Sequence, residues 1–213
     1  MRRSRAIVTR DPAHVLSVAQ AMRTTSDDEL PAFARHVQSR LAGAPPSRNV
    51  LHRGTPSAVL AALFERDAEP YVWLLRKSEK LRSHGGQVAL PGGKADPGDA
   101  SLVETALREA HEEVGLPREH VRILGALDPF PTITGYLVSP FVGLVPDDFA
   151  PVPDASEVAR VFPARLATFA SEPELRDVSV LSWRRLMPSY EVDGEIVWGA
   201  TLSILQKLAR KLA

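Results

Sequence analysis

The sequence has no cysteine among its 213 residues, which excludes disulfide bonds, thiolate metal sites and a cysteine nucleophile. It has no apolar run near the roughly 18 residues that a membrane-spanning helix needs. It also has no excess of either charge, because 26 Lys and Arg residues balance 26 Asp and Glu residues. A chain without net charge has no global field that attracts nucleic acid or an anionic membrane. We therefore expect neither as a partner.

The N-terminus lacks the uninterrupted apolar core of a secretory signal. Its first ten residues, MRRSRAIVTR, are rich in Arg and free of acidic residues, so a mitochondrial transit peptide stays open for a eukaryotic source. We favour a cytoplasmic protein of bacterial type. The absence of cysteine is compatible with a reducing compartment.

Residues 1–46 are predicted to form an N-terminal extension with one or two helices and a linker. Residues 11–18 are interpreted either as a short helix or as a mobile extension. A firmer helix is predicted over residues 30–41, where apolar residues recur at helical spacing after capping candidates at 26–28. Residues 45–47, Pro-Pro-Ser, are typical of a linker. The helix would pack on the main domain or on a second subunit, which leaves a homodimer open.

Residues 47–213 are predicted to form the main domain, since a chain that is 44% apolar can bury one sizeable core. Apolar runs at 57–64 and 71–76 flank a polar turn and predict a β-hairpin. Asp193 and Gly194 predict a second tight turn before a final amphipathic helix. We expect further strands at 87–90, 121–127 and 137–145, and a proline-rich loop at 145–155. This pattern predicts an α/β fold with a central mixed sheet covered by helices on both faces.

The most informative segment covers residues 91–116, PGGKADPGDASLVETALREAHEEVGL. At about 100° per residue, Glu109, Glu112 and Glu113 fall on one arc of a helix, beside its apolar stripe. Like charges at this spacing repel one another by roughly 0.2–0.5 kcal/mol per pair. A bound divalent cation would offset this repulsion, because hard divalent ions are ligated by carboxylate oxygens. The helix therefore predicts a metal site for a phosphate-containing substrate.

The alternative is an ordinary solvated acidic face, which is common on helices. The flanking residues favour the metal site. Gly92 and Gly93 permit close backbone approaches, Asp99 can cap the helix that follows, and Gly115 can end it.

The stretch resembles the signature of the Nudix hydrolases, in which a glycine pair precedes Arg-Glu, two further residues, Glu-Glu and a glycine. The matching positions are Gly92, Gly93, Arg108, Glu109, Glu112, Glu113 and Gly115. The resemblance implies an α/β/α sandwich and Mg²⁺ or Mn²⁺ held by Glu109, Glu112 and Glu113. The general pattern has a Glu six residues after the second glycine and seven residues between it and the Arg. This chain has Asp99 there and eight residues before Arg108, so we leave Asp99 out of the ligand set.

The preceding segment, Leu74 to Lys94, resembles the extra motif of the coenzyme A pyrophosphatase branch. The matching positions are Lys77, Ser78, Leu81, Gly86, Val88, Leu90 and Pro91, with Lys in place of Arg at 77 and Leu in place of Phe at 90. The resemblance implies hydrolysis of coenzyme A or acyl-coenzyme A to 3′,5′-ADP and 4′-phosphopantetheine or its acyl derivative. The predicted substrate contacts are Lys77 and Arg82, which lie in a basic loop, together with Gly92 and Gly93 in the glycine turn that follows this loop.

Two further catalytic assignments stay open, the role of Arg108 and the identity of the general base. Arg108 would either orient the glutamates or contact phosphate, and we favour the orienting role. The general base would be Glu109 or a carboxylate from a distant loop, such as Glu157, whose alternative interpretation is an ordinary exposed residue.

Two other functions stay open. One is hydrolysis of another nucleoside diphosphate derivative, such as ADP-ribose or NADH, which the motif at 74–90 disfavours. The other is a non-catalytic nucleotide-binding module, which the retained glutamates disfavour. Free versus acyl-coenzyme A, the number of metal ions and the oligomeric state also stay open at this point.

Overall fold

The computed structural model describes residues 30–42, 54–81, 83–180 and 183–212. Its main sheet has eight strands in the order β3-β2-β1-β7-β5, with β4 paired to β1, β6 to β7 and β8 to β2. The strands of this sheet are β1 Thr55–Arg66, β2 Glu69–Lys77, β3 Val88–Ala89, β4 Gly92–Lys94, β5 Arg122–Ala126, β6 Phe130–Pro131, β7 Tyr136–Leu144 and β8 Val158–Arg165. Strands β1 and β7 are parallel neighbours and the other pairs are antiparallel. The predicted mixed sheet is therefore confirmed.

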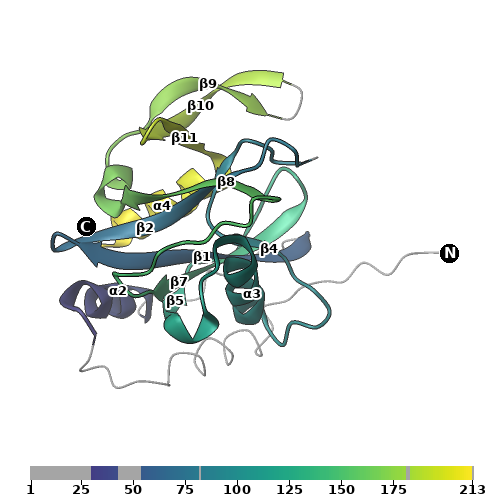
Figure 1. The fold of residues 1–213 in the computed structure, drawn as a ribbon. Helices are drawn as coiled ribbons and strands as arrows, with labels where there is room; N and C mark the ends of the chain where they lie inside the picture. The colour runs from purple at the N-terminus through teal and green to yellow at the C-terminus, as the bar shows by residue number, and fades with distance from the viewer. Residues whose placement is uncertain (1–29, 43–53, 82, 181–182, 213) are drawn as a thin grey trace.

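A second, three-stranded antiparallel sheet lies beyond β8 and joins the last helix (Figure 1). It contains β9 Glu174–Val180, β10 Trp183–Val192 and β11 Glu195–Trp198. The helices are α2 Ala32–Ala42, α3 Leu102–Val114 and α4 Gly199–Leu212, with short 3₁₀ helices η2 Arg118–His120 and η3 Leu166–Ala170. No helix in the described ranges combines the length and apolarity that crossing a membrane requires.

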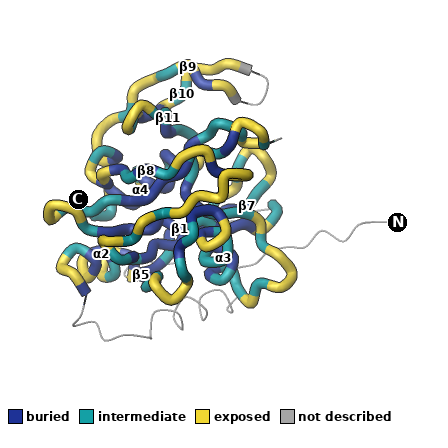
Figure 2. The backbone as a smooth tube through the Cα atoms, viewed as in Figure 1, coloured by how far each residue is buried: buried dark blue, intermediate teal, exposed yellow. Residues whose placement is uncertain are grey.

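Helices cover both faces of the main sheet, as its central strand shows. Along β1, Ala61 and Leu63 pack in one core with residues of α2 and α4, whereas Leu60 and Phe64 pack in a second core with residues of α3. Successive side chains of a strand point to opposite faces, so a strand buried on both faces has a nearly continuous apolar sequence. Figure 2 shows the resulting buried sheet between more exposed outer surfaces. The predicted α/β/α sandwich is confirmed.

The two predicted hairpins are present. Strands β1 and β2 are joined at Asp67 and Ala68, and β10 and β11 at Asp193 and Gly194. All four turn residues have positive φ angles, between 54° and 78°, which is typical of two-residue hairpin turns that match the twist of the strands. The predicted strands at 87–90, 121–127 and 137–145, the loop at 145–155 and the final helix are also present, with small differences at their ends.

Helix α2 matches the helix predicted over residues 30–41, and it belongs to the core of the main sheet. Its apolar residues Ala34, Val37 and Leu41 are buried and pack in the cluster that contains α4. The predicted division at residue 46 stays a prediction. The predicted helix at 11–18, the capping candidates at 26–28 and the linker at 45–47 all lie outside the described residues.

Candidate active site

Helix α3 carries the acidic motif and has well-defined ends. Its N-cap is Ser101, whose Oγ accepts a hydrogen bond from the Glu104 amide at 3.2 Å. Its C-terminus is Gly115, with a left-handed φ of 69° and an amide that donates to the His111 carbonyl at 3.0 Å. The predicted end at Gly115 is confirmed, whereas the prediction that Asp99 caps the helix is wrong, because Ser101 is the capping residue.

Asp99 instead holds the guanidinium of Arg108. Arg108 Nε and Nη2 donate to the two Asp99 oxygens at 2.9 and 3.0 Å, and the Thr105 hydroxyl donates to Asp99 Oδ2 at 2.8 Å. Such a two-point ion pair fixes the plane of the guanidinium as well as its place. The Arg108 guanidinium holds the pKa of the Asp99 carboxyl well below its usual range, so Asp99 is ionised at neutral pH.

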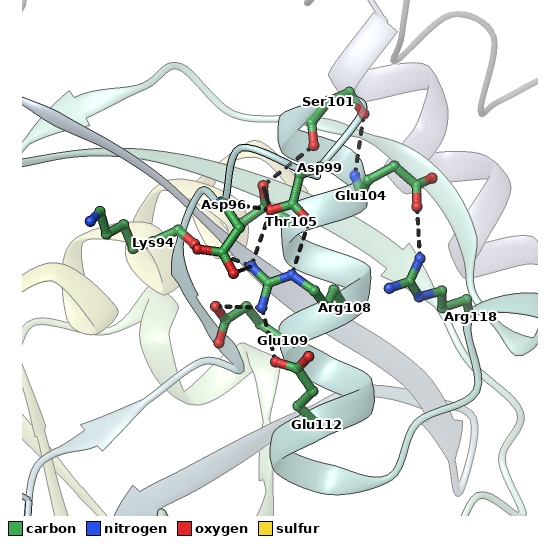
Figure 3. Close-up of polar contacts among 10 residues, drawn as sticks. All are labelled: Lys94, Asp96, Asp99, Ser101, Glu104, Thr105, Arg108, Glu109, Glu112 and Arg118. Atoms are coloured by element: carbon green, nitrogen blue, oxygen red, sulfur yellow. Dashed lines mark hydrogen bonds and ion pairs between the residues drawn. The ribbon is translucent and has the colours of Figure 1, made fainter.

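Arg108 uses its remaining nitrogen to bridge two glutamates of the motif. Arg108 Nη1 donates to Glu109 Oε1 at 3.0 Å and to Glu112 Oε2 at 2.9 Å. Figure 3 shows the guanidinium between the carboxylates of Asp99, Glu109 and Glu112. The orienting role expected of Arg108 stays a prediction about catalysis, and these contacts support it.

The glycine pair is packed against the glutamates. Gly93 lies opposite Ala58 in the pairing of β4 with β1, and a Cβ atom at Gly93 would collide with the Glu109 carboxylate. Gly92 has a φ of 154°, and its amide donates to Glu113 Oε2 at 2.9 Å. Gly93 therefore leaves room for the Glu109 carboxylate, whereas Gly92 is required by its φ angle and by its close approach to the backbone of β1. The predicted contact of both glycines with substrate stays a prediction.

Glu113 is the most buried acid of the motif, with a side chain that is 2% exposed. Its Oε1 accepts a hydrogen bond from Lys77 Nζ at the end of β2. Burial raises the pKa of the Glu113 carboxyl, the Lys77 ammonium and the Gly92 amide lower it, and the negative charge of Glu157 raises it again. The balance is a raised pKa, so this carboxylate depends on nearby positive charge.

Glu109 has a similar electrostatic environment. Burial raises the pKa of its carboxyl, the Arg108 charge lowers it, and the charge of Glu113 raises it again. Glu112 differs from both, because its side chain is 57% exposed. The motif therefore combines two carboxylates drawn into the protein with one that faces solvent.

Lys77 and Arg82 were the predicted phosphate contacts. Lys77 lies opposite Val158 of β8, next to an irregularity in the pairing of β2 with β8, and its ammonium contacts Glu113. A contact of Lys77 with substrate would require the ammonium to leave Glu113. Arg82 lies outside the described residues, so both contacts stay predictions.

Glu157 comes into the neighbourhood of Glu113 from a loop more than forty residues further along the chain. The Ser78 amide donates to the Glu157 carbonyl at 2.8 Å, and the Asp154 amide donates to the Glu113 carbonyl at 3.0 Å. These bonds tie the loop both to the end of β2 and to the end of α3. The Glu157 side chain is exposed, and its catalytic role stays a prediction.

An open cavity of about 760 Å³ lies beside the N-terminal end of α3. It is lined by Asp96, Pro97, Gly98, Asp99, Ala100, Glu104, Arg108 and Arg118. The cavity touches the site only through the Asp99–Arg108 pair, since none of the three motif glutamates lines it. The chemistry of the site therefore belongs to the carboxylates and not to this cavity.

The three motif glutamates fit a divalent ion by the chemistry of their donors. They offer carboxylate oxygens, which Mg²⁺ and Mn²⁺ prefer, and two of them have pKa values raised by burial. Within the described ranges, however, no three acidic or histidine side chains are arranged to hold a metal ion. In this structure Arg108 instead pairs with Glu109 and Glu112, and Lys77 pairs with Glu113.

Sequence reasoning missed two contacts of the site. The Asp99–Arg108 pair had a signal, since Asp99 stands where the general family pattern has an acid. The Lys77–Glu113 pair had none, because it depends on how β2 packs beside α3.

Comparisons with known proteins show the family to which this chain belongs. Residues 54–191 match the sequence profile of the NUDIX domain. A protein of Photorhabdus laumondii named uncharacterized Nudix hydrolase NudL is 39% identical over 170 residues, which cover 79% of this chain and 90% of that protein. A protein of the same name from Yersinia enterocolitica is 43% identical over 160 residues, which cover 73% of this chain and 80% of that protein. The solved NUDIX domain of Shewanella oneidensis NrtR, complexed with ADP ribose, has a TM-score of 0.49 at 18% identity and covers 81% of this chain and 96% of its own. This chain belongs to the Nudix hydrolase family.

Proposed function

We propose that this enzyme is a divalent-metal-dependent pyrophosphohydrolase that cleaves coenzyme A or acyl-coenzyme A to 3′,5′-ADP and 4′-phosphopantetheine or its acyl derivative. The observation that carries the proposal is the arrangement of the motif glutamates between the glycine pair and the end of β2. Glu109, Glu112 and Glu113 share one face of α3, and Glu109 and Glu113 lie against the glycine pair. At the end of β2, Lys77 contacts Glu113, and the Ser78 amide bonds to the Glu157 carbonyl.

Glu109, Glu112 and Glu113 would hold Mg²⁺ or Mn²⁺. Such an ion, when bound, neutralises charge on phosphate oxygens and lowers the pKa of bound water. The protein's own contribution is orientation. Asp99 fixes Arg108, and Arg108 in turn fixes Glu109 and Glu112 through hydrogen bonds of 2.9–3.0 Å.

The substrate assignment rests on the segment between β2 and β4, which resembles the coenzyme A branch. Its base is closed by two backbone hydrogen bonds, from the Lys77 amide to the Gln87 carbonyl at 2.9 Å and from the Gly86 amide to the Lys77 carbonyl at 3.1 Å. Residues 78–81 and 83–86 therefore lie in a loop held at the end of β2 beside Glu113, which is a common setting for substrate contacts. Lys80 and His84 in this loop are exposed, and the positive charge of Lys80 suits an anionic substrate.

The general base has two candidates with different properties. The Glu109 carboxyl has a raised pKa, which favours proton transfer near neutral pH, but it already accepts a hydrogen bond from Arg108. Glu157 is exposed and lies on a loop anchored to Ser78. A pH profile of each Glu→Gln variant distinguishes them, since loss of the base removes the limb of the profile that reports its ionisation.

The test of the proposal is mass analysis of the products formed from coenzyme A in heavy-oxygen water with Mg²⁺ or Mn²⁺. We expect the two named products, with one heavy oxygen incorporated at the attacked phosphorus. ADP-ribose and NADH are the comparison substrates, and faster cleavage of either would favour the alternative substrate class. Absence of metal-dependent hydrolysis with all three would favour a non-catalytic nucleotide-binding module. Glu104→Gln is a matched control on α3, because Glu104 is 40% exposed and pairs with Arg118 instead of the motif.

A further inference from the structure

The buried carboxylate of Glu113 has a lysine as its counterion. Lys77 Nζ donates to Glu113 Oε1, and the two side chains are 16% and 2% exposed. The two residues come from different elements, the end of β2 and the last turn of α3. Their contact therefore depends on the tertiary packing of β2 and α3.

The buried Glu113 carboxylate needs the Lys77 ammonium as its counterion when no metal ion is bound. A carboxylate taken out of water loses its hydration, and an unpaired buried charge destabilises a protein strongly. The other hydrogen bond of the Glu113 carboxylate comes from the Gly92 amide. Glu157 adds negative charge nearby, and its effect on the Glu113 pKa opposes that of Lys77.

The ammonium and a divalent ion compete for the same carboxylate. Glu113 Oε1 already accepts a hydrogen bond from the Lys77 ammonium, which therefore occupies the position that an ion bound to this oxygen would take. An ion at Glu113 would also lie beside a positive charge, and like charges in a partly buried site repel strongly.

Lys77 is the cation that can leave. Arg108 is anchored by two hydrogen bonds to Asp99, so it can release a glutamate and keep its place. Among the contacts of the described residues, the Lys77 ammonium bonds to Glu113 alone. Its long flexible side chain can move the charge with little change in the strand.

We propose that Lys77 is the built-in counterion of Glu113 in the metal-free enzyme, that a divalent ion displaces its ammonium, and that Lys77 thereby sets the affinity for metal. This inference rests on the proposed function, in which Glu113 is a metal ligand. The released ammonium remains beside the site. It is then available for the phosphate contact that the sequence predicted.

The test measures Mn²⁺ binding to the metal-free enzyme without substrate, from the spectroscopic signal of free Mn²⁺. Lys77→Gln removes the charge and keeps a hydrogen-bond donor, and we expect it to bind Mn²⁺ roughly ten-fold more tightly than the wild type or better. Lys94→Gln is the matched control, because Lys94 is an exposed lysine of β4 beside the glycine pair. We expect less than about a two-fold change for this control, since exposed charges are screened by solvent.

A second variant covers the case in which Lys77→Gln does not fold. Lys77→Arg keeps the positive charge and offers a two-pronged grip on the carboxylate, so we expect Mn²⁺ binding no tighter than in the wild type. Equal or weaker binding by Lys77→Gln, or tighter binding by Lys77→Arg, would overturn the inference. If the wild type binds Mn²⁺ and Lys77→Gln matches it, the counterion role alone fails. If the wild type binds no Mn²⁺ at millimolar concentration, the proposed metal site fails as well.

Discussion

Replacing Asp99 by Asn should weaken both the fold and the catalytic site, because Asp99 is the anchor of Arg108. The Asp99 side chain is only 8% exposed and meets Nε and Nη2 of Arg108 with its two oxygens. Asn has nearly the same shape but presents an NH₂ group to one of these donors. A hydrogen bond to a charged group contributes about 1.5–3 kcal/mol. We therefore expect Asp99→Asn to lower the free energy of unfolding by about 2 kcal/mol, which lowers Tm by roughly 4–8 °C in a chain of this size.

The same substitution should reduce activity. A loosened Arg108 no longer holds Glu109 and Glu112 in place, and loss of a residue that supports metal ligands commonly costs about 10–100-fold in metal affinity or activity. Urea unfolding, Mn²⁺ binding and the rate of coenzyme A hydrolysis measure the three effects. Asp96→Asn is the control, because Asp96 is 64% exposed and lies 3.8 Å from Arg108. An exposed pair of this kind contributes at most about 1 kcal/mol.

The effect of Asp99→Asn should also depend on pH in a defined way. The pKa of Asp99 is lowered in the folded enzyme, so its stabilising effect is fully present above the unfolded pKa of about 3.9. The effect is lost as pH falls through the lowered pKa. The difference in stability between the wild type and the variant should therefore stay constant from neutral pH down to about pH 5 and shrink only in strong acid. A difference that vanished between pH 7 and 5, or an Asp99→Asn enzyme with wild-type stability and rate, would refute this account of Arg108.

Three further substitutions test the rest of the site. Gly93→Ala places a Cβ atom against the Glu109 carboxylate, so we expect at least a roughly ten-fold loss of kcat/KM. Gly98→Ala, in the loop that follows β4, meets no atom within 4 Å and should be nearly neutral in the same assay. Glu113→Gln removes the negative charge of a proposed metal ligand, so turnover should fall by orders of magnitude with an unchanged far-UV circular dichroism spectrum. An unchanged rate at saturating Mg²⁺ would contradict the assignment. Glu157→Gln should lower kcat by about 10²–10⁴-fold with KM little changed if Glu157 is the base, and a wild-type pH profile in this variant would leave Glu109 as the candidate.

The elements that could be predicted from the sequence are those with strong local patterns. Helix α3 was predicted from its apolar stripe and its terminal glycine, although its capping residue is Ser101 and not the predicted Asp99. Strand β8 was missed, since its burial follows no simple alternation and its sequence contains Pro163. Strand β9, ELRDVSV, was missed because it is mainly polar and has Val178 as its buried hydrophobic residue. Both strands owe their existence to partners elsewhere, β8 to β2 and β9 to β10.

The same distinction between local and distant partners applies to the catalytic site. The spacing of Glu109, Glu112 and Glu113 on one helix face follows from the helical period alone. The cation that pairs with Glu113 depends instead on how strands distant in the sequence are aligned. The pairing of β2 with β8 puts Lys77 opposite Val158, and this register brings the ammonium to Glu113 and the Ser78 amide to the Glu157 carbonyl. A shift of one residue in that pairing would turn Lys77 to the other face of the sheet. The motif thus predicts which atoms would bind a metal ion, whereas the register of one strand decides that Lys77 is the cation that neutralises Glu113 in this structure.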